Sequence, residues 1–162
     1  MRAGRELVAL LLTVVSSAAC TLPEAFTGRF VAVNEAVARD RRTGLEWTRA
    51  DGERSLSWAA ADDYCRSLVL AGRDDWRLPE IAELQALYDE RQRQPCGATE
   101  DCRLDPVIDL TDPYVWSATA RGVGTRFYIN FQFGTTFSPN TPPTLVRRVL
   151  CVRSASQPAS GA

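Results

Sequence analysis

Cysteine is the residue type in this chain with the widest chemistry, because a thiolate can bind metal, attack a substrate, carry a lipid or pair as a disulfide. The five cysteines are Cys20, Cys65, Cys96, Cys102 and Cys151. No two are spaced as Cys-x-x-Cys and the chain contains no His, so a structural zinc site is not expected. Without Cys20 the set is even, which is typical of two disulfides in an oxidising compartment. Four cysteines allow three pairings, and loop closure alone does not choose among them. The short polar loop between Cys96 and Cys102 favours that pair, together with Cys65 and Cys151.

The first 19 residues are typical of an export signal. Basic residues near the start precede an uncharged and mostly apolar stretch at 7–19, which is too short to cross about 30 Å of hydrocarbon as a helix. Small residues at 17–19 come directly before Cys20, as in a bacterial lipobox, in which the cysteine is acylated and becomes the mature N-terminus. The same residues also fit ordinary signal-peptidase cleavage after Ala19. We expect a signal peptide at 1–19, a lipid on Cys20, a linker at 20–29 and a location in the cell envelope, on the periplasmic or surface side.

Composition argues against most familiar enzyme classes. The chain has 162 residues, 45% hydrophobic and 24% charged, which fits one globular domain. It has neither His nor Lys, so Ser-His and Cys-His pairs, Schiff-base lysines and P-loop lysines cannot form. Its 19 basic residues, all Arg, nearly balance 20 acidic ones, and the net charge of −1 gives no excess positive field for nucleic acid. We therefore expect no catalytic residue, no cofactor, no metal and no nucleic-acid partner.

Hydrophobic periodicity predicts two helices. Residues 58–71 place apolar side chains three and four positions apart, with Ser57 as the N-cap and Gly72 in the position of a C-terminal capping glycine. Residues 79–91 repeat the helical spacing, and Pro79 suits the first turn of a helix.

Strands are expected on both sides of these helices, because short apolar runs are separated there by turn residues. Residues 92–114 show no period and predict a long loop that a disulfide holds, and Gly134 permits a turn between two later strands. The expected strands are 30–33, 35–39, 45–47, 126–133, 135–138 and 145–153. Residues 154–162 carry no core side chain and predict a disordered tail.

The strand at 126–133 supplies candidate ligand contacts, because its apolar and polar residues alternate. Its apolar side chains should be buried: Phe127, Ile129, Phe131 and Phe133. The alternate side chains should face solvent and are the candidate ligand-binding residues: Arg126, Tyr128, Asn130 and Gln132. A charge, an aromatic ring and amides together are typical of a recognition surface, and a merely solvated strand face fits the same pattern.

Tryptophans and aspartates raise two further hypotheses. Flat aromatic rings can stack on sugars, but large rings inside predicted elements more often pack in the core. We therefore favour core packing over sugar stacking for Trp47, Trp58, Trp76 and Trp116. Carboxylates can bind a hard cation such as Ca²⁺, but Asp residues in Pro-rich loops more often form turns. We therefore favour turn formation over cation binding for Asp105, Asp109 and Asp112.

Several segments resemble the Lcl C-terminal domain family in order and spacing: residues 43–47 (TGLEW), 58–65 (WAAADDYC), 71–84 (AGRDDWRLPEIAEL), 114–119 (YVWSAT) and 148–153 (RVLCVR). The resemblance covers about residues 30–153 and implies an α+β domain with a C-type lectin-like fold, in which two helices pack on small antiparallel sheets. The family takes its name from the C-terminal domain of a bacterial collagen-like adhesin. It is also related to sulfatase-modifying factors and was long a domain of unknown function, so the resemblance implies no activity.

Enzymatic and calcium-dependent relatives of this fold provide a contrast. Formylglycine-generating relatives need two reactive cysteines that bind copper, whereas the cysteines here are expected to form disulfides. The Glu-Pro-Asn and Trp-Asn-Asp motifs of calcium lectins do not occur in the sequence. We therefore expect a noncatalytic binding module at the cell envelope that recognises a polysaccharide or another surface ligand. The alternative is a structural envelope lipoprotein that contacts other envelope proteins, and a formylglycine-generating enzyme is the least favoured of the three.

Overall fold

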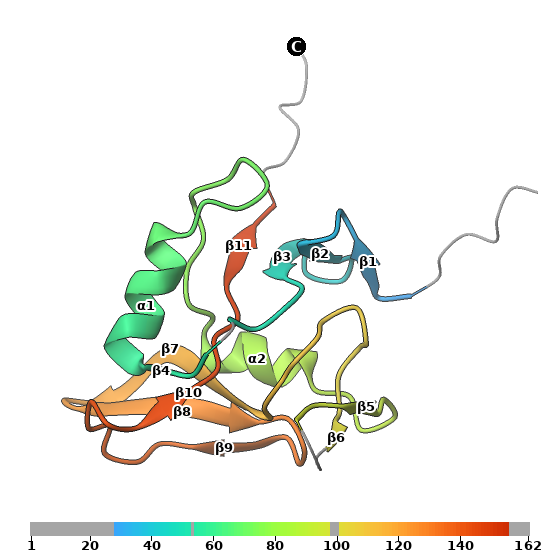
Figure 1. Cartoon of the computed structure of the whole chain (residues 1–162). Helices are drawn as coiled ribbons and strands as arrows, with labels where there is room; N and C mark the ends of the chain where they lie inside the picture. Colours follow the sequence, from blue (N-terminus) through green and yellow to red (C-terminus); the bar gives the residue numbers. More distant parts are fainter. Residues whose placement is uncertain (1–27, 53, 98–100, 156–162) are drawn as a thin grey trace, which may run out of the picture.

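The computed structural model describes residues 28–52, 54–97 and 101–155, which form two helices and several small antiparallel sheets (Figure 1). The expected signal peptide, Cys20, most of the linker and residues 156–162 of the expected tail lie outside the described residues. Within the described ranges, no helix is both long enough and apolar enough to span a bilayer.

A four-stranded sheet joins the beginning and the end of the domain. Its strands are β1 (Phe30–Ala32), β2 (Val37–Asp40), β3 (Leu45–Thr48) and β11 (Val152–Ser154). They pair antiparallel in the order β1-β2-β3-β11. Gly44 has a positive φ of 74°, and the tight turn from β2 to β3 needs a residue that tolerates this conformation. Because β11 lies beside β3, the last strand closes the domain against its first hairpin.

A second, three-stranded sheet lies below the first in Figure 1, and a short helix lies between the two sheets. The sheet consists of β7 (Tyr114–Gly122), β8 (Thr125–Asn130) and β9 (Thr135–Phe137), and the helix is α2 (Ile81–Leu87). One face of this sheet packs on α2 and on the first sheet in a buried cluster that includes Trp47, Leu84, Leu87, Val115 and Ile129. Burial of these apolar side chains stabilises the domain and fixes the two sheets relative to each other.

The other face of the second sheet is covered by α1 (Trp58–Ser67), β4 (Leu56–Ser57) and β10 (Val146–Arg147). Strands β4 and β10 pair antiparallel. The side chains under this cover form a second buried cluster, which includes Ala61, Cys65, Trp76, Trp116 and Cys151. Cys65 and Cys151 are joined there, and Cys96 is joined to Cys102 beside the small hairpin of β5 (Gln94–Pro95) and β6 (Asp101–Cys102). Both disulfide predictions are confirmed.

Both predicted helices are present, and both are shorter than expected. Ser57 is the N-cap of α1, and its Oγ accepts a hydrogen bond from the Ala60 backbone N–H. The helix ends at Ser67 because Leu68 is extended and its N–H bonds to the Cys65 carbonyl. Gly72 lies in a later turn, where the backbone groups of Leu70 and Arg73 bond to each other, so it does not cap the helix.

The start of α2 is fixed by side chains rather than by Pro79. Glu80 is the N-cap, and its backbone N–H donates to the Glu83 carboxylate at 2.8 Å, as in one half of a capping box. The helix ends at Leu87, four residues before the predicted end at 91, because Tyr88 adopts an extended conformation and its N–H bonds to the Gln85 carbonyl.

Three of the four strands before α1 were predicted and β4 was not, whereas the predictions after α2 are wrong in detail. The expected single strand at 145–153 is divided into β10 and β11. Between them Val149, Leu150 and Cys151 are all buried, because this stretch passes between the two clusters and has no solvent face. Ser154, placed in the tail by composition, pairs with Leu45 at the end of β11. The predicted loop at 92–114 contains the short strands β5 and β6, which pair with each other next to the Cys96–Cys102 disulfide.

Candidate functional site

The predicted solvent face of β8 is wrong for two of its four residues. Tyr128 is 8% exposed and Asn130 is 3% exposed, whereas Arg126 and Gln132 are half-buried. The reason is that α1, β4 and β10 cover this face, so the second half of β8 is buried, whereas its first half, which includes Arg126, is only partly buried. Phe133, which the alternation placed in the core, is 64% exposed because β8 ends at Asn130. The structure therefore does not present the four candidate residues as one surface.

Tyr128 instead lies at the centre of an aromatic group. Its ring stacks on Phe137 at a centroid distance of 5.2 Å and meets Trp116 and Tyr114 edge-on at 5.6 and 5.9 Å. Asn130 has a turn-forming role, since its Oδ1 accepts a hydrogen bond from the Gln132 N–H at 2.7 Å. Both residues thus support the sheet.

Arginine side chains lie on the outside of this aromatic group. The Arg126 guanidinium sits over the Trp58 ring, 4.1 Å from its centroid. The Arg147 guanidinium sits 4.5 Å from the Tyr128 centroid and 5.1 Å from that of Tyr114. A cation over an aromatic face is attracted by the ring quadrupole, so both guanidinium groups are held in place.

These arginines belong to a segment of the sequence that carries charge of one sign. From residue 113 to the end of the sequence there are five arginines and no Asp or Glu. Arg148 and Arg153 form ion pairs with carboxylates earlier in the chain. Among the described residues, no carboxylate comes within ion-pair distance of the remaining three, Arg121, Arg126 and Arg147. We call these three residues with Trp58 and Tyr114 the arginine face.

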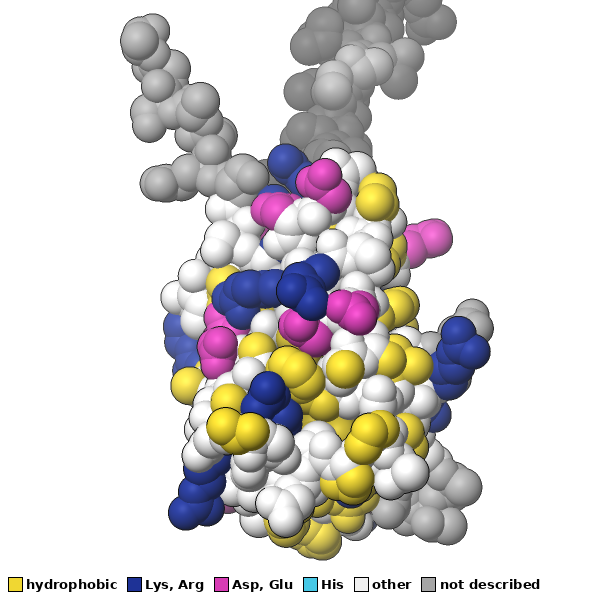
Figure 2. All heavy atoms as spheres, turned by 90° about the vertical axis from the view of Figure 1, so that its left-hand side faces the viewer, with side chains coloured by type: hydrophobic (Ala, Val, Ile, Leu, Met, Phe, Trp, Pro, Cys, Tyr) yellow, Lys and Arg dark blue, Asp and Glu magenta, His cyan; other side chains and the backbone are white. Residues whose placement is uncertain are grey.

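Figure 2 views the molecule from the side on which α1 and the β7–β8 hairpin lie. Hydrophobic side chains gather in the lower half of this view, whereas acidic side chains stand mainly above them. Exposed apolar residues near the second sheet are Val123 in the turn between β7 and β8, Phe137 in β9 and Val146 in β10. The second sheet and β10 therefore carry both exposed apolar side chains and the arginines that have no carboxylate partner among the described residues.

A small pocket opens on the arginine face where α1 begins. It has a volume of about 150 Å³, and its lining includes Trp58, Ala59, Arg126, Pro142 and Pro143. Arg126 Nη1 donates to the carbonyls of Gly122 and Thr125 at 3.3 and 3.1 Å. Of the predicted ligand-binding residues, Arg126 alone lines this pocket, and the other lining residues were not predicted. The distribution of Asp and Glu along the chain was the available signal, because it marks the segment that carries the unpaired arginines.

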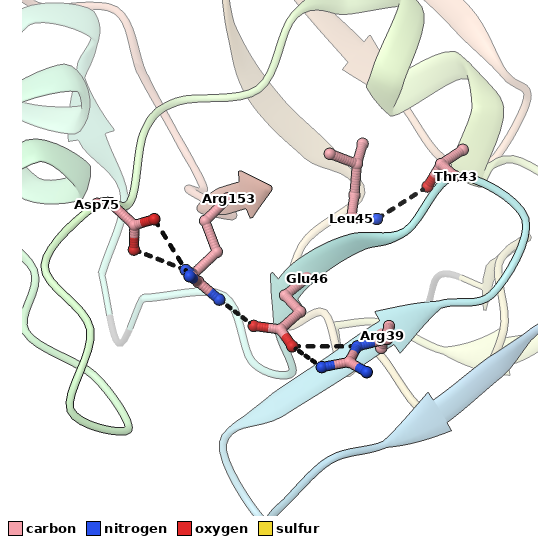
Figure 3. A network of polar contacts seen from close by, with 6 residues as sticks. All are labelled: Arg39, Thr43, Leu45, Glu46, Asp75 and Arg153. Carbon is pink, nitrogen blue, oxygen red and sulfur yellow. Dashed lines mark hydrogen bonds and ion pairs between the residues drawn. The ribbon is translucent and has the colours of Figure 1, made fainter. Parts of the chain in front are cut away.

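A buried ion-pair network lies elsewhere, at the end of the first sheet (Figure 3). Arg153 is 2% exposed and donates to Asp75 through Nε at 2.6 Å and Nη2 at 3.1 Å. Its Nη1 donates to Glu46, which also accepts from Arg39 at 2.5 Å. The Arg153 guanidinium also lies 5.8 Å from the Trp76 ring centroid. Asp75 and Trp76 belong to the DWRLP segment, so this motif holds the last strand to the loop before α2.

Arginine partners favour the ionised form of several carboxyl groups in the domain. Burial favours the neutral form of Glu46, but hydrogen bonds from Arg39 and Arg153 outweigh it and lower the pKa of Glu46. The same balance lowers the pKa of Asp40 beside Arg29 and that of Glu83 beside Arg77. Asp51 behaves differently, because burial raises its pKa despite hydrogen bonds from Thr111.

These lowered pKa values predict that acid destabilises the fold. A carboxyl group with a lowered folded-state pKa adds stability above its ordinary pKa, and that stability is lost as the pH falls through the folded value. The ordinary values are 3.8 for Asp40 and 4.5 for Glu46 and Glu83. The free energy of unfolding, measured with urea, should therefore fall steadily as the pH is lowered from about 4.5 to 2. Equal stability at pH 6 and at pH 2.5 would contradict these assignments.

Burial and hydrogen bonds show where the tryptophans and aspartates singled out in the sequence lie and what they contact. Trp47, Trp76 and Trp116 are at most 3% exposed and pack in the core, whereas Trp58 is half-buried under Arg126. Asp105 and Asp112 accept hydrogen bonds from the N–H groups two residues ahead, as turn formers do. No group of three or more His, Cys, Asp or Glu that could hold a metal ion is found in the part of the chain that the structure describes.

Comparison with known proteins gives one family. The family model described as the Lcl C-terminal domain matches residues 36–153, from the turn before β2 to β11. The match spans well over half of the chain and includes the DWRLP segment, both helices and all four disulfide-forming cysteines. A search of the curated proteins finds no match. The chain belongs to the Lcl C-terminal domain family.

Proposed function

We propose that this protein is a noncatalytic binding module of the cell envelope that holds a polysaccharide, preferentially one with negative charges, through the arginine face. The observation that carries the proposal is the combination of Arg121, Arg126 and Arg147 without a carboxylate partner among the described residues and the absence of Asp and Glu after residue 112. A surface with one sign of charge attracts ligands of the opposite sign. Guanidinium groups suit this role because their planar N–H groups match carboxylate and sulfate oxygens.

The geometry also favours binding over catalysis. The most perturbed carboxylates are held in ion pairs or hydrogen bonds with Arg or Thr, where their oxygens are occupied. The disulfides occupy all four cysteines of the described residues, so these thiols are not free nucleophiles. The arginine face, by contrast, presents cations that are fixed on aromatic rings.

Neutralising the arginine face should abolish most binding to an acidic polysaccharide. The triple variant Arg121→Gln, Arg126→Gln, Arg147→Gln is expected to bind a uronate-rich or sulfated polysaccharide about tenfold or more weakly, since each lost charge-assisted contact weakens the complex. The measurement is calorimetry at low and at physiological salt, against a neutral glucan as the reference ligand.

A matched control removes the same charge elsewhere. Arg66, Arg91 and Arg93 are exposed and paired with nearby carboxylates, so their triple Gln variant changes net charge equally without touching the arginine face. The control should bind within about twofold of the parent protein. Equal losses in both triple variants would show that binding follows net charge, and the arginine face would not be the site.

A second candidate function is favoured by the exposed apolar side chains beside the arginine face. Phe137 is 40% exposed and Val146 is 42% exposed. Such surface suits contact with an envelope protein, which would make this a structural lipoprotein. Polysaccharide binding that is unaffected by Phe137→Ser together with Val146→Ser supports the first function. Retention by a defined envelope protein that is lost in this double variant supports the second.

Export and anchoring are part of the same proposal. We infer that the protein is exported as a lipoprotein with a diacylglyceryl group on Cys20, supported by the apolar stretch at 7–19, the small residues before Cys20 and the disulfides of the domain. Intact mass spectrometry of protein purified from its native membrane should show a lipid adduct on a chain that begins at Cys20. An unmodified N-terminus after Ala19 would show a secreted, unanchored protein instead.

We also propose that the domain has a C-type lectin-like fold and shares it with sulfatase-modifying factors. Two helices on small antiparallel sheets, a last strand beside the first hairpin and the Cys65–Cys151 link between α1 and the segment before β11 support this relationship. Superposition of an experimental structure of this domain on C-type lectins and on sulfatase-modifying factors tests the relationship.

A further inference from the structure

The pocket beside Trp58 has a size and lining that restrict what it can hold. A volume of about 150 Å³ is comparable to cavities that accommodate a group of roughly six heavy atoms. Its walls include Ala59, Gly124, Pro142 and Pro143, whose side chains offer no hydrogen bond. The hydroxyl groups of Ser57 and Thr141 also line the pocket, but both already bond to backbone groups: Ser57 accepts from the Ala60 N–H, and Thr141 accepts from the Arg126 N–H and donates to the Pro139 carbonyl. Sugar hydroxyl groups placed against these walls would lose their bonds to water without replacement. The pocket therefore suits a small group with an apolar body.

Arg126 supplies the polar end of the pocket. Its guanidinium is fixed by the Trp58 ring and by the carbonyls of Gly122 and Thr125, so little conformational freedom is lost when a ligand binds. Within the described residues, Nη2 of Arg126 has no recorded hydrogen bond and no carboxylate lies within ion-pair distance. An anionic oxygen is the partner that this group lacks.

Trp58 supports the arginine and does not act as a sugar platform. The Arg126 guanidinium occupies a face of the indole ring, and the indole N–H donates to the Ser117 carbonyl at 2.8 Å. A sugar ring therefore cannot stack on that face while Arg126 is in place. Specificity at this point comes from the cation and the apolar walls.

We infer that the pocket binds the carboxylate of a short alkyl group, of the size of propionate. Two envelope sources carry this chemistry: a terminal alanine on a peptide and a lactyl ether on a sugar. The inference deepens the proposed function and rests on it, because the alkyl carboxylate is a substituent of the polymer that the module holds. It also explains why an apolar pocket lies within a cationic face.

Titration with small acids tests the inference. The probes are propionate, N-acetylalanine and the 3-O-lactyl ether of N-acetylglucosamine, and the matched uncharged probes are propionamide and N-acetylalanine methyl ester. Binding is followed by amide and indole resonances in nuclear magnetic resonance at low ionic strength. We expect saturable binding of the acids with shifts at Trp58, Ala59 and Gly124, and at least about tenfold weaker binding of the uncharged probes. The two N-acetyl probes separate the peptide source from the sugar source by their relative affinity.

Variants locate the site. Arg126→Gln removes the cation and Ala59→Phe fills the pocket from the exposed side of α1, and each should weaken propionate binding about tenfold or more. Arg66→Gln is the control, because it removes the same charge from an exposed residue of α1 that belongs neither to the pocket nor to the arginine face. It should leave the affinity within about twofold. Circular dichroism confirms that each variant is folded.

The outcomes separate the inference from the proposed function. Equal binding of the acid and its ester, equal loss in Arg66→Gln, or sulfate binding as tightly as propionate would overturn the inference. If a polysaccharide binds through the arginine face while the small acids do not, the inference fails and the proposed function stands. If propionate binds in the pocket while no polysaccharide binds, the proposed function fails instead.

Discussion

Replacing both Cys65 and Cys151 with alanine is expected to lower the free energy of unfolding by about 4 to 5 kcal/mol. The disulfide joins residues 86 positions apart, and a cross-link over a loop of that length removes much of the entropy of the unfolded chain. It also joins α1 to the segment before β11, so the last strand and the first helix lose their covalent tie together. Urea denaturation at constant m-value measures the loss. A domain of this size has limited stability, so the variant should be largely unfolded at 37 °C.

The second disulfide is the internal control for this result. Cys96 and Cys102 are only six positions apart, and the same entropy argument assigns their bond about 2 kcal/mol. The double alanine variant at 96 and 102 should therefore retain a folded core. If removal of Cys96–Cys102 costs as much as removal of Cys65–Cys151, loop entropy does not explain the role of these bonds.

Arg153→Met is expected to cost about 3 to 5 kcal/mol of stability. The substitution keeps an apolar stem of similar length but removes the guanidinium from Glu46, which is 6% exposed, and from Asp75. Glu46 keeps its pair with Arg39 but loses its buried partner, so less of the cost of its desolvation is compensated. Thermal and urea unfolding of the variant measure this effect.

Two further variants show whether the cost arises from the buried charge. Adding Glu46→Gln to Arg153→Met removes the buried carboxylate charge, which Arg39 alone would then pair, and should recover part of the loss, because Glu46 and Arg153 are coupled. Arg91→Met breaks an exposed ion pair with Asp89, and it should change stability by less than about 1 kcal/mol. If Arg153→Met unfolds no more easily than Arg91→Met, the network in Figure 3 does not hold the last strand.

Sequence patterns identified the elements that depend on local interactions. Ser57 caps α1 as predicted, and the inward-facing Cys65 pairs with Cys151. Helix ends were wrong because tertiary contacts decide them. Leu68 and Tyr88 leave the helical conformation although periodicity continues beyond them.

The candidate site was less predictable, for a physical reason. Alternation along β8 assumes one covered face, yet both faces of the second half of this strand are covered, so Tyr128 and Asn130 are buried despite their polar groups. Nothing local in the sequence shows that β4 and β10 meet over this face, because they are at least 89 positions apart in the chain. The absence of Asp and Glu after residue 112 is visible in the sequence, but only the structure shows which arginines lack a carboxylate partner among the described residues.

The central claim is that an acidic polysaccharide binds on the arginine face, and the indole resonances of the four tryptophans test it most directly. Trp58 lies on that face under Arg126, whereas Trp47, Trp76 and Trp116 are buried in the core. Titration of the labelled protein with a uronate-rich polysaccharide should move the Trp58 indole signal in a saturable way and leave those of Trp47 and Trp76 in place. Binding that leaves Trp58 unchanged, or that shifts the core tryptophans instead, would contradict the account.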